Sequence, residues 1–365
     1  MKIVDLRPMM VRRFARSDNH PRTAGFPGRL AGFVSDAIIR RKVSSRPRPQ
    51  GGPLLVSVGN LALGGTGKTP VVMALARDLA AAGLKGAILT RGYGSSLAGP
   101  LIVDPADCKA GDEARMMAQV LAGSGWPVVQ SRNRPAGLDY LRSSCTDLQV
   151  VLLEDAFQTA QLARHIDLVI LDSWEMVEHE ETLRVRPLTG SIFPFGPWRE
   201  TARGAGRASA LLIEGNRQQA TTSLTGQPVF YFERFVQLRK VQGQEMDELC
   251  NNWALLSGIA RPEKFENSAR ELLDGETVLS IRCQDHAQYT AGLVLTVLKE
   301  MEIVGAAGLV TTAKDWVKLS TVWTDSRPVV VLDMDLQWEQ KNALHHWLAE
   351  RVREQVSDQS ESTAP

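Results

Sequence analysis

A glycine-rich loop between an apolar strand and an amphipathic helix constrains this chain more than any other feature. The loop reads Ala62-Leu63-Gly64-Gly65-Thr66-Gly67-Lys68-Thr69. Residues 54–58 before it are mostly apolar, and the residues after Pro70 are apolar at the i, i+3, i+4 spacing of a helix. A loop in this position directs backbone N–H groups toward anions at a helix N-terminus, so the sequence predicts a phosphate-binding loop.

The side chains of this loop fit a nucleoside triphosphate. Its glycines let the backbone approach phosphate oxygens without interference from a Cβ atom. Lys68 would reach the β- and γ-phosphates, and the hydroxyl of Thr69 would bind Mg²⁺. Ala62 replaces the first glycine of the G-x-x-x-x-G-K-[ST] pattern. A glycine-rich turn with an incidental lysine is the alternative, but the strand and helix around the loop favour nucleotide binding.

Charge is distributed unevenly along the chain. The net charge of the 365 residues is +1, yet residues 1–50 hold twelve Lys and Arg against three Asp and Glu. This local excess favours an anionic partner, for which a membrane surface and a nucleic acid are the candidates. A disordered basic leader is the alternative.

The segment 26–42 has apolar residues on one helical face and a cationic end. Such a helix can lie in a membrane interface or pack against the body of the protein. No apolar run is long enough to cross a bilayer, and the basic start lacks the apolar core of a signal peptide. The four cysteines form no C-x-x-C pair, which favours a reducing compartment. We therefore predict a cytoplasmic protein that contacts a membrane only peripherally.

Short apolar runs alternate with helical patterns along the chain, which is typical of an α/β fold with a parallel sheet covered on both faces. The expected strands of the first lobe are 54–58, 86–90, 127–130, 150–153, 168–171 and 210–213, and those of a smaller second α/β lobe are 253–257, 277–281, 308–311 and 329–332. Residues 229–232 and 235–238 are expected to form a β connection between the lobes. The predicted division is a basic segment 1–50, a P-loop core 51–225, a second lobe 226–355 and a disordered tail 356–365.

Two acidic residues follow one of the apolar strands. The strand 150–153 ends in Glu154 and Asp155, which is the position of a Walker B carboxylate. A carboxylate there can bind Mg²⁺ beside Thr69, directly or through water. The pair is weak evidence alone and stronger after a phosphate-binding loop.

Two further groups have both a structural and a chemical interpretation. Asp112 begins a helical pattern, where it either caps the helix or takes part in chemistry. His286 follows Asp285 at a strand end, where a histidine can act as a general base or orient one. Taken by itself, His286 fits a surface residue better.

Together these segments resemble the tetraacyldisaccharide 4′-kinases, which phosphorylate the lipid A precursor at the inner membrane. The motifs that carry the resemblance stand in the family's order: Val58-Gly59-Asn60, Gly64-Gly65-Thr66-Gly67-Lys68-Thr69-Pro70, Thr90-Arg91-Gly92-Tyr93-Gly94, Gly111-Asp112-Glu113, Glu154-Asp155-Ala156-Phe157-Gln158, Phe195-Gly196-Pro197-Trp198-Arg199-Glu200, Ser257-Gly258-Ile259-Ala260-Arg261-Pro262-Glu263-Lys264-Phe265, Asp285-His286-x-x-Tyr289 and Thr312-Ala313-Lys314-Asp315. The resemblance spans roughly residues 26–335.

The resemblance implies two α/β lobes joined by a β linker, with the basic N-terminal helix as the membrane contact. It also implies ATP, Mg²⁺ and a disaccharide glycolipid acceptor as ligands. An Asp–His pair, here Asp112 and His286, is implied to assist the attacking hydroxyl. Among the motif residues, Arg91, Arg199 and Glu200 are candidates for contact with the acceptor.

The chain departs from the family's motifs at five positions. Glu154 stands where the family has Asp, Ala156 where it has Gly, Thr159 and Ala287 where it has His, and Ser95 replaces a usual Arg or Lys. Glutamate keeps the charge of aspartate but lengthens the side chain, which bears on metal geometry. Thr159 and Ala287 each remove a neighbouring imidazole of the motif, but not the groups expected to act directly in the reaction.

We therefore predict a P-loop kinase that transfers the γ-phosphoryl group of ATP to the 4′-hydroxyl of a tetraacylated glucosamine disaccharide 1-phosphate. The residues expected to take part in catalysis are Asp112, His286 and Lys68. Residues 62–69 are expected to bind the nucleotide, and Thr69, Asp155 and Glu154 to bind Mg²⁺. The expected partners are the lipid A precursor and an anionic inner-membrane surface, with no nucleic acid and no protein partner. The alternatives are another P-loop small-molecule kinase and a weakly catalytic nucleotide-binding relative.

Overall fold

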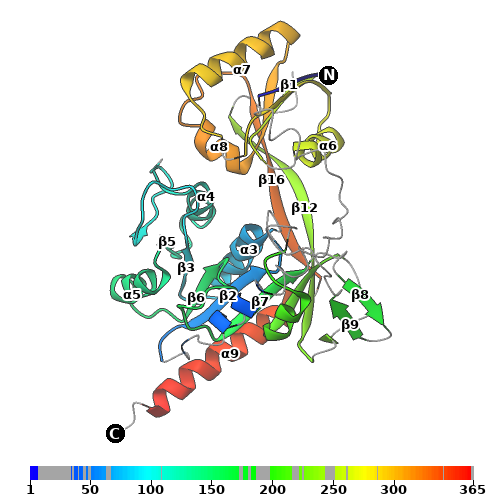
Figure 1. The fold of residues 1–365 in the computed structure, drawn as a ribbon. Coiled ribbons are helices and arrows are strands. Elements are labelled where there is room, and N and C mark those ends of the chain that lie inside the picture. The colour runs from blue at the N-terminus through cyan, green and yellow to red at the C-terminus, as the bar shows by residue number, and fades with distance from the viewer. Residues whose placement is uncertain are drawn as a thin grey trace. The chain divides into compact units, whose positions relative to one another are not determined.

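The structure of the chain is a computed structural model. It describes residues 1–6, 51–62, 67–107, 109–171, 198–215, 226–242, 251–259, 262–285, 287–339 and 341–362, with short pieces at 34, 37–39, 41–43, 47, 176–179, 182–185 and 222–223. The chain divides into two compact units (Figure 1). The P-loop unit comprises His20–Arg234 and Leu336–Pro365, and the second unit comprises Met1–Asn19 and Phe235–Asp335.

The P-loop unit is built on a largely parallel sheet in the order β12-β10-β7-β2-β6-β3-β5-β4. Its strands are β2 (Leu54–Asn60), β3 (Gly86–Thr90), β4 (Leu101–Ile102), β5 (Val128–Gln130), β6 (Val150–Glu154), β7 (Ile166–Leu171), β10 (Ala210–Glu214) and β12 (Val229–Gln242). The pairs from β12 to β5 are parallel, whereas β4 is antiparallel to β5. The loop that follows β2 therefore lies at the same sheet edge as the carboxyl ends of β6 and β7.

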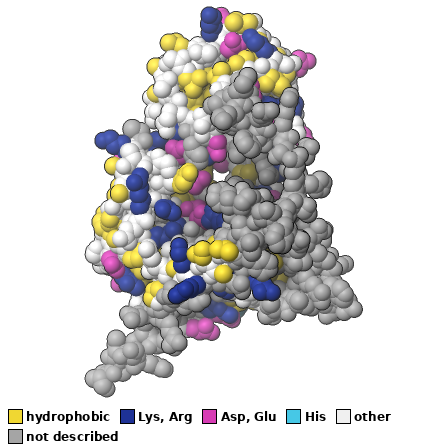
Figure 2. Space-filling model, in the orientation of Figure 1, with side chains coloured by type: hydrophobic (Ala, Val, Ile, Leu, Met, Phe, Trp, Pro, Cys, Tyr) yellow, Lys and Arg dark blue, Asp and Glu magenta, His cyan; other side chains and the backbone are white. Residues whose placement is uncertain are grey.

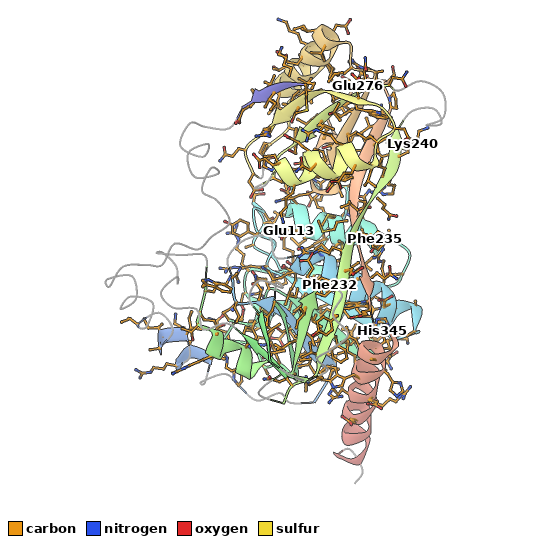
Figure 3. All side chains as sticks on the ribbon, turned by 90° about the vertical axis from the view of Figure 1, so that its right-hand side faces the viewer. Glu113, Phe232, Phe235, Lys240, Glu276 and His345 are labelled. Atoms are coloured by element: carbon orange, nitrogen blue, oxygen red, sulfur yellow. The ribbon has the colours of Figure 1, made fainter. Side chains whose placement is uncertain are left out.

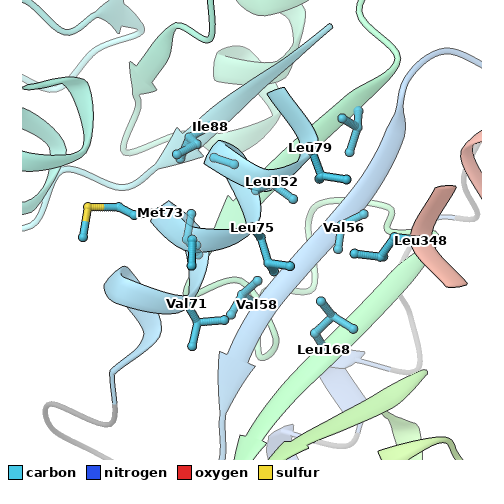
Figure 4. Packing of buried hydrophobic residues seen from close by; sticks show 14 of the residues in the cluster. Val56, Val58, Val71, Met73, Leu75, Leu79, Ile88, Leu152, Leu168 and Leu348 are labelled. Carbon is cyan, nitrogen blue, oxygen red and sulfur yellow. The ribbon is translucent and has the colours of Figure 1, made fainter. Parts of the chain in front are cut away.

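Helices cover both faces of this sheet, which is why its central strands are continuously apolar. The helices are α3 (Lys68–Ala81), α4 (Asp112–Val120), α5 (Arg134–Ser144) and α9 (Lys341–Ser362). Val56 and Val58 pack with α3, α4 and α9 in one buried cluster, while Leu55 packs with α5 in another. Figure 4 shows Leu75 and Leu79 of α3 over the strands, with Leu348 of α9 in the same layer. The position of α3 is therefore fixed by core packing on the strand that precedes the loop.

In the second unit, parallel strands pair in the order β1-β14-β13-β15-β16. Its elements are β1 (Lys2–Asp5), β13 (Asn252–Ser257), α6 (Pro262–Leu272), β14 (Glu276–Arg282), α7 (Ala291–Val304), β15 (Gly308–Thr312), α8 (Ala313–Leu319) and β16 (Val329–Trp338). Val297 and Met301 of α7 pack with one face, and Phe265 of α6 packs with the other. This arrangement is again an α/β fold with helices on both faces.

Two strands, β12 and β16, run from one unit into the other. The sequence predicted two β segments at 229–232 and 235–238, but β12 is a single strand of 14 residues. Figure 3 labels Phe232, Phe235 and Lys240 along it. The charged residues Glu233 and Arg234 interrupt the apolar pattern without ending the strand, because side chains beyond Phe232 alternate between exposed and partly buried positions.

The last helix differs from its prediction in length and in location. It runs to Ser362, whereas the sequence predicted a disordered tail from 356. No Gly or Pro stands between Lys341 and Ser362, so no residue ends the helix earlier. It also belongs to the P-loop unit, not to a lobe 226–355, because Leu344, Leu348 and Val352 lie in that unit's core.

The first residues of the predicted basic segment 1–50 form a strand that was not predicted from the sequence. Lys2–Asp5 pair in parallel with β14. The β-branched pair Ile3-Val4 favours that conformation. A separate small sheet contains β8 (Met176–His179), β9 (Thr182–Val185) and β11 (Thr222–Ser223), and a 3₁₀ helix, η2, spans Ala202–Arg207.

The described surface has a mixed character. On the face drawn in Figure 2, basic, acidic and apolar side chains are interspersed over the described residues. None of the helices in the described part of the chain has the length and apolarity required to cross a membrane.

Candidate active site

The predicted phosphate-binding loop connects β2 to α3. Gly67 is the N-cap of α3 and has φ 77°, a left-handed conformation that favours glycine. Lys68 and Thr69 follow as the first helical residues, and both are buried. Residues Leu63, Gly64, Gly65 and Thr66 lie outside the described part of the chain.

The Lys68 ammonium group is held between two neighbouring strand ends. It donates to Asn60 Oδ1 at 3.2 Å and lies 3.7 Å from Asp155 Oδ1. Asn60 also donates to the carbonyl of Ala62 at 2.7 Å, which fixes the first turn of the loop. This geometry follows from strand pairing, because β6 lies beside β2 with Val58 opposite Glu154.

Asp155 has a second cationic partner. Both terminal nitrogens of Arg199 donate to its carboxylate, at 2.7 and 2.9 Å. Arg199 is placed by the backbone, since its N–H donates to the carbonyl of Leu61 and Trp198 bridges to Ala62. Asp155 itself has φ 50°, which is rare for a residue other than glycine and is often found at functional sites.

The two acids at the end of β6 have different electrostatic environments. Burial works to raise the pKa of Asp155, but Lys68 and Arg199 outweigh it and lower the pKa below its ordinary value. Burial, followed by the charges of Asp155 and Glu113, raises the pKa of Glu154 to about 7. Glu154 accepts a hydrogen bond from Thr90 at 3.0 Å and is only 5% exposed. Asp155 is therefore the anionic and accessible member of the pair.

Arg134 fixes the turn that carries these acids. Its guanidinium donates to the carbonyls of Glu154 at 2.7 Å and Asp155 at 2.9 Å, and to the hydroxyl of Thr159 at 3.0 Å. Thr159, one of the departures from the family motif, thus serves as an acceptor in this network. The role of Arg134 could not be predicted from the sequence, because no motif or periodicity connects a residue at a helix start to a strand end twenty positions away.

Glu200 is held in a buried hydrogen-bond network. Its side chain is fully buried and accepts from Arg207 at 2.6 Å and from Gln158 at 2.9 Å. Gln158 in turn donates to the carbonyl of Asn60 at 2.8 Å. Glu200 therefore positions Gln158, and its contact with the acceptor stays a prediction.

The segment around Asp112 is held by a glutamine. Gln130 accepts from the N–H of Gly111 at 2.8 Å and donates to Ser95 Oγ at 2.8 Å. Gly92 has φ 67°, and a Cβ there would lie 2.0 Å from Gln130 Cδ. Gly111, not Asp112, is the N-cap of α4, so the capping interpretation of Asp112 is wrong: Asp112 is the first helical residue.

The second unit holds the remaining motif residues. Lys314 donates to Asp285 at 3.2 Å. Asp315 is fully buried and accepts from the N–H of Gly258 at 2.9 Å and from the hydroxyl of Thr312 at 2.7 Å. His286 lies outside the described residues.

Comparison with known proteins decides the family. The profile of the tetraacyldisaccharide-1-P 4′-kinase family matches residues 33–353. The chain belongs to this family. A tetraacyldisaccharide 4′-kinase of Phenylobacterium zucineum is 33% identical over 84% of the chain and 88% of that protein. One of Methylorubrum extorquens is 31% identical over 92% of the chain and 96% of that protein.

The fold of this family member also matches a solved structure. The LpxK protein of Aquifex aeolicus, crystallised in complex with ATP, aligns with a TM-score of 0.64 and 24% identity, over 88% of this chain and 97% of that one. The predictions of a P-loop α/β fold, of the family and of a kinase are thereby confirmed. The described site residues Lys68, Asp155 and Arg199 lie together, and Thr69 adjoins Lys68.

Proposed function

We propose that this chain transfers the γ-phosphoryl group of ATP to the 4′-hydroxyl of a tetraacylated glucosamine disaccharide 1-phosphate. Membership of the kinase family supports the reaction. The observation that carries it in the structure is the Lys68 ammonium group, buried at the N-terminus of α3 and 3.7 Å from the strand-end carboxylate of Asp155. Phosphoryl transfer depends mainly on positioning and charge neutralisation, which this pair of groups can provide.

We propose that residues 62–69 bind the ATP phosphates and that Thr69 and Asp155 hold Mg²⁺. A hydroxyl and an ionised carboxylate form a hard oxygen donor set, which suits this ion. When bound, Mg²⁺ would neutralise charge on the β- and γ-phosphates. The raised pKa of Glu154 and its bond to Thr90 favour Asp155 over Glu154 as the direct ligand.

Arg199 would compete with the metal for Asp155. Each oxygen of Asp155 accepts one hydrogen bond from its guanidinium, so a cation bound to this carboxylate would weaken the pairing with Arg199. A guanidinium loosened in this way could contact the acceptor, which is the role predicted for this residue. Arg91, exposed after the end of β3, stays a proposed acceptor contact.

We also propose that Asp112 and His286 assist deprotonation of the acceptor hydroxyl. A sugar hydroxyl is a poor nucleophile, and an oriented base contributes about 10²–10⁴-fold to such a step. Asp112→Ala and His286→Ala should each lower kcat with little change in the KM for ATP. Because the residues would act as a unit, the double variant should be scarcely slower than the slower single variant. Losses that multiply in the double variant would mean independent roles.

The reaction is tested directly with purified protein. Incubation with γ-³²P-labelled ATP, Mg²⁺ and the tetraacyldisaccharide 1-phosphate should label the lipid, and Lys68→Ala should abolish labelling. An acceptor blocked at the 4′-hydroxyl should remain unlabelled. Labelling of other hydroxylated acceptors in preference to this lipid would favour a different small-molecule kinase. ATP binding without transfer to any acceptor would favour the weakly catalytic relative.

We further propose peripheral attachment to an anionic inner-membrane surface on its cytoplasmic face. The described part of segment 34–43 is helical, and its side chains Val34 and Ile38, one turn apart, are 55% and 49% exposed. The basic residues of the first fifty positions would add about 1 kcal/mol each near an anionic surface. Exposed apolar groups beside cations suit a helix that lies in the membrane interface.

Vesicle sedimentation tests this attachment. Val34→Asp/Ile38→Asp should reduce binding to phosphatidylglycerol vesicles, and high salt should weaken binding of the wild type. The matched control is Leu295→Asp/Ile303→Asp, which changes two exposed apolar residues of α7. Equal, salt-insensitive binding of all three proteins would refute the proposal.

A further inference from the structure

An arginine from a distant strand lies against the phosphate-binding loop. A Cβ atom built on Gly67 would lie 2.4 Å from Nη1 and 2.9 Å from Cζ of Arg234. Arg234 is on β12, more than 160 positions along the chain, and its side chain is 15% exposed. The absence of a Cβ at Gly67 thus makes room for a guanidinium as well as for the left-handed turn.

The guanidinium of Arg234 is oriented by an acid on the neighbouring strand. Glu214 at the end of β10 accepts from Nε at 2.7 Å through one oxygen and from Nη2 through the other. Nε and Nη2 thus pair with Glu214, and Nη1 is the guanidinium atom nearest to the Cβ position of Gly67. The carboxyl end of β10, and the part of β12 just beyond its pairing with β10, therefore supply a fixed pair of charges beside Gly67.

Strand order places this pair on the opposite side of β2 from Asp155. The sequence of strands is β12-β10-β7-β2-β6, so β10 and β12 lie beyond β7, whereas Asp155 follows β6. In open α/β sheets, ligands bind at the carboxyl ends of the strands, in the crevice where the order of the strands reverses. In the proposed ATP complex, Lys68 and Asp155 would lie at the γ-phosphate. Arg234 lies against Gly67 on the side of β10 and β12.

The electrostatics favour an anion between Arg234 and the loop. A helix N-terminus carries a partial positive charge, so a guanidinium beside it is unfavourable unless a negative group joins them. Glu214 balances the arginine but pairs with its far edge. A phosphate at the loop would complete the arrangement.

We infer that Arg234 is a positioning residue for ATP, donating to the α/β-phosphate segment from Nη1, with Glu214 as the acid that orients it. This inference rests on the proposed use of ATP. If Arg234 served only to fill the space over Gly67, the affinity for ATP would not depend on the charge at position 234.

Isothermal titration with ATP, and with tripolyphosphate as a probe that lacks adenosine, tests the inference. Arg234→Ala should weaken both by about tenfold or more, the loss expected for one charge-assisted hydrogen bond. Arg234→Lys should recover part of that loss. Arg239→Ala, which removes an exposed arginine of the same strand paired with Asp333, is the matched control and should bind as the wild type does.

A double variant separates phosphate contact from packing. Arg234→Ala leaves the carboxylate of Glu214 facing the phosphates, so Arg234→Ala/Glu214→Gln should bind ATP more tightly than Arg234→Ala. Tripolyphosphate binding unchanged in Arg234→Ala, or equal ATP binding by the single and double variants, would overturn the inference. Failure of the wild type to bind ATP at all would refute the proposed function instead. If Arg234→Ala does not fold, Arg234→Lys and Glu214→Gln carry the same test, with several-fold losses expected and wild-type binding overturning it.

Discussion

Each of the two units places an aspartate just after the carboxyl end of a parallel strand, and the partners of the two aspartates differ in kind. Asp155 of the P-loop unit lies between Lys68 and Arg199, both cations. Asp315 of the second unit accepts from a backbone N–H and a hydroxyl, both neutral. Asp155 keeps 26% of its side chain exposed, whereas Asp315 is fully buried.

The difference distinguishes a carboxylate whose partners can be exchanged (Asp155) from one with an architectural role, which holds the local fold in place (Asp315). The side chain of Asp155 can be reached, and Arg199, a charged partner from another segment, would be able to move to another anion if the proposed metal ion bound there. The partners of Asp315 belong to the backbone of Gly258 and to Thr312, the N-cap of α8, and cannot move away without local unfolding. Position at a strand end therefore does not by itself identify a catalytic acid.

The largest expected contrast is in activity. Asp155→Asn should lower turnover by at least about 10²-fold, because it removes charge where the transition state needs it. Its melting temperature should fall only modestly, because the amide nitrogen cannot accept from Arg199 although the side chain keeps the shape of the carboxylate. Phosphoryl transfer measured across a Mg²⁺ titration, with calorimetry on the same samples, checks both. Near-normal activity of Asp155→Asn at every Mg²⁺ concentration would place the metal-binding acid elsewhere.

The second contrast is in stability. Asp315→Ala should lower the free energy of unfolding by about 3 kcal/mol, because two buried donors lose their acceptor and a small cavity forms. Asp333→Ala, at an exposed ion pair with Arg239, is the control and should cost less than about 1 kcal/mol. Urea denaturation measures both. An Asp315→Ala protein as stable as the Asp333→Ala protein would remove the architectural role of Asp315.

Much of the fold could be predicted from local sequence patterns. The apolar runs at 54–58 and 150–153 correspond to β2 and β6, since buried parallel strands are continuously hydrophobic. The glycine and lysine of the loop indicated the nucleotide site for the same local reason. The end of α9 was missed because composition near the terminus is polar, although no residue there breaks a helix.

The partners of the charged residues could not be predicted in this way. Arg134, Arg199 and Arg234 contact Asp155 or Gly67 from distant positions in the sequence, and only the tertiary fold brings them together. Arg199 stood in a motif, which marked it as important without indicating that it pairs with Asp155. Glu200, next to it in the same motif, has a buried supporting role that only packing reveals.

The smallest expected effect concerns Glu154, which stands beside Asp155 but has the burial of Asp315. Its pKa is about 7 in the folded protein against an ordinary 4.5. Well below pH 4.5, Glu154 is neutral in both the folded and the unfolded protein. Between pH 4.5 and 7 it ionises only in the unfolded protein, so the free energy of unfolding falls as pH rises. Above pH 7 it is ionised in both states, and the whole cost of the buried charge remains. Glu154→Gln stays neutral and should escape this loss, gaining no more than about 3 kcal/mol over the wild type above pH 7 and almost nothing near pH 4.5.

Urea denaturation at several pH values, without Mg²⁺ and nucleotide, measures the gain in the free energy of unfolding. Glu271→Gln, at an exposed position of α6, is the control and should give a pH profile parallel to the wild type. A parallel profile for Glu154→Gln as well would mean that Glu154 ionises normally, and that it shares the environment of Asp155 after all.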